Sequence, residues 1–144
     1  MKSTRPDIFT FYRVRFVVFA ALSLLGTLLL GACFSLQDNR TATQDWLNAQ
    51  AGTSQADISG TWKSERWGWA NFRQSGNKIT GQLGIYNVDG RSVGEKIYLA
   101  LSDAGRTYYT SILSVENARE LNGKISSALP FSDLKAQRIV LKKF

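Results

Sequence analysis

The sequence predicts an all-β fold, a small antiparallel up-and-down β-barrel of about eight strands that follows an apolar N-terminal signal helix, a tether and a short helix. From residue 58 onward, β-branched and aromatic residues alternate with polar residues, which is the two-residue period of a half-buried strand. Turn-forming residues recur at roughly 8–12-residue intervals, the spacing of short strands. No stretch between them is long enough for a helical crossover, so the strands run antiparallel, and closing them into a barrel removes exposed edges.

Residues 1–32 have the pattern of a secretory signal peptide. Residues 1–15 carry four basic residues and one acidic residue, and residues 16–30 then carry no charge. A basic start, an apolar run of roughly 7–15 residues and small residues at its end are typical of an export signal. The alternative is an uncleaved transmembrane anchor, for which about 20 apolar residues are needed. Both interpretations place the following residues outside the cytoplasm.

The one cysteine of the chain, Cys33, ends this apolar run in the sequence Leu30-Gly31-Ala32-Cys33. These four residues resemble the lipobox of bacterial lipoproteins, which implies that Cys33 becomes the mature N-terminus and carries fatty acyl chains such as palmitate. Two or three acyl chains give a stable membrane anchor, whereas one gives marginal binding. With Phe34 next in the chain, the resemblance implies the periplasmic face of the outer membrane in a Gram-negative cell, and otherwise the outer face of the cytoplasmic membrane. The alternative is a buried cysteine in an ordinary signal peptide.

Residues 33–57 are predicted to form the lipidated N-terminus, a tether and a short helix. Most of these residues are small or polar, as in flexible linkers. Thr43 is a suitable cap for a helix that runs to Ala51, with Gly52 ending it. A large apolar side chain such as Trp46 is unusual in a solvent-exposed tether. We therefore expect this helix to pack onto the folded domain, as a plug at one end of the barrel.

Residues 58–144 are the predicted barrel domain. Strands are expected at 78–86, 93–102, 107–115 and 138–144, and others fill the intervals. The turns are expected at glycine- and asparagine-containing sites, namely Ser75-Gly76-Asn77, Asp89-Gly90, Asp103-Ala104-Gly105, Asn122-Gly123 and Ser132-Asp133.

The opening of this domain, Ser59-Gly60-Thr61-Trp62, carries the G-x-W motif of the calycin superfamily, which includes lipocalins, fatty-acid-binding proteins and avidins. With Ile79-Thr80-Gly81 further on, it most resembles the avidin-type opening. The resemblance implies that Gly60 and Trp62 close one end of the barrel. It also implies that a basic residue of the last strand, Arg138 or failing it Lys142, lies on the indole ring. Such a cation–π contact contributes about 0.5–2 kcal/mol.

The composition argues against most classes of enzyme. The chain has no histidine, so the commonest general base and metal ligand is absent, and one cysteine cannot form an internal disulfide or a thiolate zinc cluster. No G-x-S-x-G elbow or EF-hand loop is present. We therefore expect a protein that is not an enzyme and that holds no cofactor or metal. Without residues 1–32 the chain is only mildly basic, and no basic cluster in the sequence predicts a nucleic-acid partner.

Aromatic residues are the candidate binding surface. Trp67 and Trp69 share one face of a strand and either form an outward patch or fill the barrel. Tyr108 and Tyr109 are adjacent and must straddle the sheet, and Tyr86 begins a segment interpreted as a turn. Exposed Tyr and Trp suit sugar or protein partners.

Two classes of function follow for the membrane-anchored domain. The first is a binding or interaction module for a small apolar ligand or an envelope protein. The second is a purely structural envelope lipoprotein with a packed barrel. A protein inhibitor that resembles the lipoprotein lysozyme inhibitors is a third hypothesis, and the oligomeric state stays open.

Overall fold

The computed structural model describes residues 40–144. The predicted signal peptide, the lipobox residues and Cys33 lie outside the described residues. Within residues 40–144, no helix is long and apolar enough to cross a membrane.

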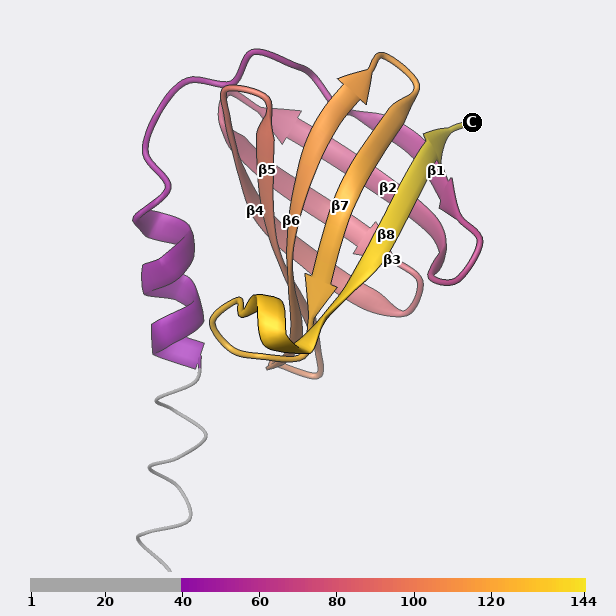
Figure 1. The fold of residues 1–144 in the computed structure, drawn as a ribbon. Helices are drawn as coiled ribbons and strands as arrows, with labels where there is room; N and C mark the ends of the chain where they lie inside the picture. Colours follow the sequence, from indigo (N-terminus) through magenta and orange to yellow (C-terminus); the bar gives the residue numbers. More distant parts are fainter. Residues whose placement is uncertain (1–39) are drawn as a thin grey trace, which may run out of the picture. The chain divides into compact units, whose positions relative to one another are not determined.

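Eight antiparallel strands pair in sequence order and close into a barrel, which confirms the predicted fold class (Figure 1). This closed antiparallel topology is consistent with a calycin-like architecture. The strands are β1 (Gly60–Ser64), β2 (Gly68–Ser75), β3 (Lys78–Leu83), β4 (Tyr86–Val93), β5 (Lys96–Asp103), β6 (Arg106–Asn117), β7 (Glu120–Ser126) and β8 (Ala136–Lys143), with a 3-10 turn, η1 (Asp133–Lys135), before the last.

Two of the expected turns lie inside strands. Gly90 belongs to β4 and Gly123 to β7, and the chain instead turns at residues 84–85 and 118–119. Both glycines mark close backbone approaches. A Cβ atom on Gly90 would lie 2.6 Å from the Tyr98 carbonyl oxygen, and one on Gly123 would lie 2.2 Å from that of Ile112. At these two positions the Asp-Gly and Asn-Gly pairs therefore mark tight strand packing and not hairpins.

The barrel interior is packed. Seven inward-facing aliphatic side chains from four strands are completely buried, so no water molecule fits beside them. They are Ile79, Leu83, Ile97, Leu99, Leu101, Leu121 and Leu141. Trp62 and Phe72 are the largest buried side chains and belong to the same core. This density leaves no room among these residues for a small ligand.

Trp62 is buried in β1 and is held from two sides. Its Nε1 donates a hydrogen bond of 2.8 Å to the carbonyl oxygen of Ile58, and the Lys143 ammonium lies 5.3 Å from its ring centroid. The expected cation was Arg138 or failing it Lys142, whereas the structure places Lys143 over the ring. Because Ile139 and Leu141 face the core, residue 143 shares their side of β8, whereas Arg138 faces outward and its Nε contacts Asn122 at 3.4 Å.

The short helix covers residues 40–48 of the described chain, so it starts earlier and ends earlier than expected. Two of its side chains contact the outer face of β4 and β5. Trp46 packs edge-to-face on Tyr98 with ring centroids 5.9 Å apart, and Arg91 donates to Asn48 Oδ1 at 3.3 Å. The helix therefore packs on the barrel wall and is not an end plug.

The segment after the helix is tied to the barrel, although composition had indicated a tether. Ser54 forms a bridge with Gly94, and its hydroxyl lies 2.7 Å from that of Ser92. Ile58 is buried, and its amide donates to Gln74 Oε1 at 3.0 Å. These bonds fix the direction from which the chain enters β1.

Candidate binding site at one end of the barrel

Four aromatic side chains meet at the end of the barrel formed by the β1–β2, β3–β4 and β5–β6 hairpins. Trp67 and Tyr109 pack edge-to-face with ring centroids 5.0 Å apart. Tyr86 lies 5.4 Å from Tyr109 and 5.9 Å from Tyr108, measured between centroids. We call Trp67, Tyr86, Tyr108 and Tyr109 the aromatic cluster. Three of them are half-buried and pack against the core, and Tyr108 is exposed.

A β-bulge brings both neighbouring tyrosines into the aromatic cluster. Leu101 of β5 pairs with Tyr109, and Ser102 pairs with Thr107, so Tyr108 is the extra residue. A bulge re-aims the side chain of the extra residue. The two tyrosines therefore both contact Tyr86, although strict alternation would have put them on opposite faces of the sheet.

One polar atom of the aromatic cluster lacks a hydrogen-bond partner. Trp67 Nε1 is buried and has no hydrogen-bond partner among the described residues. Such an unpaired donor costs about 1–3 kcal/mol. On the outer side, the Arg106 guanidinium lies 5.2 Å from the Tyr108 ring centroid. The cluster thus combines apolar ring faces with a donor that lacks an acceptor and a cation beside it.

Partial removal from water raises the pKa of Tyr86, and the neighbouring Tyr109 raises it further through its charge and a hydrogen bond. The unfolded chain then loses its Tyr86 proton before the folded chain does. Folding stability is therefore unaffected well below the ordinary tyrosine pKa of about 10, and it falls as the pH rises through that value.

We expect Tyr86→Phe to reduce this alkaline loss of stability, because the substituted ring has no proton to lose. The measurement is the denaturant midpoint between about pH 8 and pH 11. Leu134→Ala, at a non-ionisable side chain that is 97% exposed, is the control and should keep the wild-type dependence. An unchanged dependence in Tyr86→Phe would contradict the assignment.

Trp69 lies apart from the aromatic cluster, although Trp67 and Trp69 were expected to share a face. It is on the outer surface of β2 with 48% of its surface exposed, whereas Trp67 precedes the strand and bends toward the core. The Phe144 ring packs edge-on at 4.8 Å, and the Lys63 ammonium lies 5.1 Å from the Trp69 centroid. Gly68, with φ +79°, separates the two indoles and breaks the alternation.

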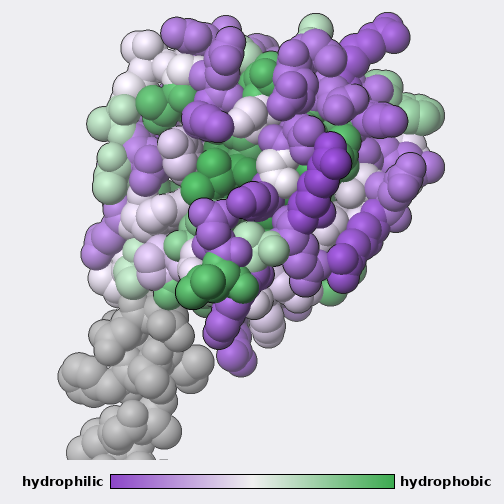
Figure 2. Space-filling view, in the orientation of Figure 1, coloured by the Kyte–Doolittle hydropathy of each residue, from purple (hydrophilic) through white to green (hydrophobic). Residues whose placement is uncertain are grey.

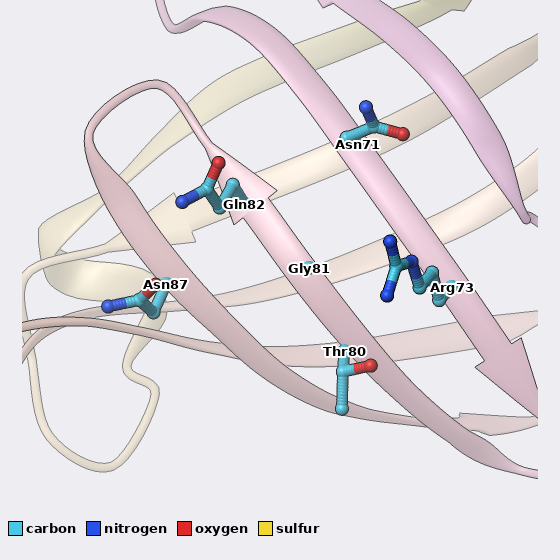
Figure 3. Close-up of a pocket in the computed structure, with 6 residues that line it drawn as sticks. All are labelled: Asn71, Arg73, Thr80, Gly81, Gln82 and Asn87. Atoms are coloured by element: carbon cyan, nitrogen blue, oxygen red, sulfur yellow. The ribbon is translucent and has the colours of Figure 1, made fainter.

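A shallow polar depression of about 380 Å³ lies on the outer face of β2, β3 and β4. Figure 3 shows its lining side chains on three neighbouring strands, with the Arg73 guanidinium turned toward the position of Gly81. The lining residues are Asn71, Arg73, Thr80, Gly81, Gln82 and Asn87. A Cβ atom on Gly81 would overlap the Asn71 carbonyl oxygen, so glycine is required there and leaves the floor of the depression bare.

The structure thus brings together four of the five aromatic residues selected from the sequence. Gly60 begins β1 beside the Lys143 side chain and Trp62 is buried, and their role in closing the barrel stays a prediction. Sequence reasoning missed Lys143, Phe144 and the polar depression. Lys143 could have been predicted, because it follows Ile139 and Leu141 at the two-residue spacing of the inward-facing residues of β8.

Comparison of the chain with models of protein families, with curated proteins and with solved structures finds no match.

Proposed function

We propose that this protein is an exported lipoprotein of the cell envelope whose barrel is a non-catalytic binding module. Anchoring rests on the lipobox resemblance at Cys33 and on the apolar run before it. In this proposal the acylated N-terminus holds the barrel at the membrane surface, and the aromatic cluster contacts an envelope protein.

The observation that carries the binding role is the convergence of the aromatic cluster around an unpaired donor. Tyr and Trp are enriched at the energetic centres of protein interfaces, because they bury large areas and offer a polar tip. A carbonyl oxygen from a partner seated on the cluster would accept from Trp67 Nε1 and remove the cost of leaving it unpaired. The exposed Ile85, in the β3–β4 hairpin beside Tyr86, adds apolar area at the same end.

The packed interior favours a partner at the end of the barrel over a small apolar ligand inside it. The same observation favours the second candidate function, a purely structural envelope lipoprotein, since a solid barrel needs no ligand. The two candidates differ in one respect. A binding module has a partner at the aromatic cluster, and a structural protein does not.

Site-specific photo-cross-linking in the native host separates them. A photo-reactive residue is placed at Ile85, which is 77% exposed, and at the exposed Glu95 in the β4–β5 hairpin at the opposite end as the matched control. We expect one discrete adduct from position 85 and none from position 95. Combining position 85 with Tyr108→Ala should abolish the adduct. No adduct at position 85, or equal adducts at both ends, would contradict the binding role.

A further inference from the structure

Charge is distributed unevenly around the barrel. Each of β4, β5, β6 and β7 carries one acidic and one basic residue. The four contiguous strands β8, β1, β2 and β3 carry basic residues and no acidic ones. Their basic residues are Lys63, Arg73, Lys78, Arg138, Lys142 and Lys143. We call the outer surface of these four strands the cationic face.

The charges of the cationic face are available to a partner. Five of the six side chains lie on the outer side of their strands and are exposed, whereas Lys143 shares the inward side of β8 and its ammonium lies over the Trp62 ring. Among residues 40–144 the ion pair formed is Lys124–Asp133, which involves none of the six. Three exposed or half-buried carboxylates border the cationic face: Glu120 of β7 opposite Lys142, Asp89 of β4 opposite Thr80, and Glu65 in the β1–β2 hairpin. Figure 2 shows hydrophilic residues over most of the side where β8 and β1 lie.

Trp69 lies in the middle of the cationic face with 48% of its surface exposed, and the Phe144 ring packs edge-on against it at 4.8 Å. Lys63, directly opposite on β1, places its ammonium over the ring. On the β3 side the neighbour is Gly84, whose amide bonds the Trp69 carbonyl and which has no side chain. A depression of about 320 Å³ lies there, lined in part by Trp69, Asn71 and Gln82.

This depression continues into the polar one shown in Figure 3, because Asn71 and Gln82 line both. The result is a groove that starts at an indole, passes between two amides and reaches Arg73 and Thr80. Amide side chains offer donors and acceptors together, and the guanidinium offers donors with a charge. The groove therefore matches a ligand that has an apolar ring face, many hydroxyl or acetamido groups, and negative charge.

We propose that the cationic face binds an acidic polysaccharide, with one sugar ring stacked on Trp69 and the chain lying along the groove. The C–H face of a pyranose packs on the indole, its hydroxyl and acetamido groups bond Asn71 and Gln82, and its carboxylates are attracted by Arg73 and Lys63. This surface is separate from the aromatic cluster, so the proposal does not depend on the proposed protein partner.

An anionic bilayer is the other partner that a cationic face attracts. A surface that inserts into the bilayer interface presents a broad apolar face beside its cations. Here the exposed apolar residues beside the cations are Trp69 and Phe144, and the depressions next to them are lined mostly by amides, threonines and glycine. The observations therefore favour the polysaccharide, and the bilayer becomes one outcome of the test.

The test uses the full chain reconstituted in phosphatidylcholine vesicles, with a hyaluronan octasaccharide as the acidic probe and chitohexaose as its uncharged counterpart. We expect the octasaccharide to change tryptophan fluorescence saturably, to bind more tightly than chitohexaose, and to weaken as salt is raised. Trp69→Ala should weaken binding by about tenfold, as for an aromatic anchor. Arg73→Gln and Lys63→Gln should each weaken it by about threefold, typical of exposed charges.

Lys96→Gln, an exposed lysine on the balanced strand β5, is the matched control and should bind like the wild type. Asn71→Ala provides a second groove variant in case Trp69→Ala alters folding, which circular dichroism checks. Failure of the octasaccharide to bind, or equal loss in Lys96→Gln, would overturn the proposal. So would protection of Trp69 from acrylamide quenching when phosphatidylglycerol is added to the vesicles, because this result assigns the face to the membrane.

Discussion

Replacing Trp62 by alanine is expected to cost about 3–5 kcal/mol of folding free energy, as for other large core truncations. The side chain is 2% exposed, so its removal leaves a cavity among packed neighbours. It also leaves the Ile58 carbonyl without the hydrogen bond that Trp62 Nε1 donates. A domain of this size has a total stability of about 5–15 kcal/mol, and the variant should therefore lie close to its unfolding threshold. Denaturant titration measures the loss.

Lys143→Met is the companion variant, because it removes the ammonium over the Trp62 ring and keeps an apolar stem. Its cost should be about 0.5–2 kcal/mol. Trp62→Phe combined with Lys143→Met should show coupling in a double-mutant cycle, whereas Arg138→Met combined with Trp62→Phe should be additive. Additive effects of Trp62→Phe and Lys143→Met, together with coupling between Trp62→Phe and Arg138→Met, would contradict the contact between Lys143 and the Trp62 ring.

Cys33→Ala is expected to abolish acylation completely, since the thioether to the lipid forms at the cysteine sulfur in lipoproteins that carry a lipobox. Cells grown with an alkyne-bearing palmitate analogue should label the wild-type protein and not the variant. The variant should also leave the membrane fraction or keep residues 1–32 uncleaved. This loss is all-or-none because a chain without acyl groups has no comparable membrane affinity.

Cys33→Ser is the conservative control and should behave like Cys33→Ala, since a hydroxyl does not replace the thiol in this modification. Labelling that persists in either variant would end the lipoprotein interpretation. The assignment of the barrel does not depend on that result, because all eight strands lie within residues 60–143.

The fold could be predicted because each strand of an antiparallel barrel alternates between residues that face the core and residues that face solvent. In β2, Ala70 and Phe72 face the core while Asn71 and Arg73 face outward, as the two-residue period requires. Turns were harder to place. Gly90 has the same local sequence as a hairpin glycine, and only the approach of the neighbouring strand shows that it belongs inside β4. Long-range packing, which no local pattern contains, decides between the two.

The candidate sites were predictable only in part, for a similar reason. Tyr86, Tyr109 and Trp67 are visible in the sequence as aromatic residues, but their convergence depends on which hairpins share an end of the barrel. Tyr108 contacts this cluster because of a β-bulge, and no residue pattern around it predicts the bulge. The cationic face was hidden because its residues come from strands at both ends of the domain, which are neighbours only after closure.

That closure has a consequence for how the barrel opens. β1 and β8 share two register pairs, Trp62–Lys143 and Lys63–Lys142, whereas β1 and β2 share five. We therefore expect the barrel to open first between β1 and β8. The amide hydrogens of this seam, the β1–β8 pairing, should exchange with solvent before those of the other strand pairs. The cationic face crosses this seam. An anionic chain long enough to continue from the groove past Lys63 of β1 to Lys142 of β8 would bridge this seam, so its binding would prolong the lifetime of the closed barrel.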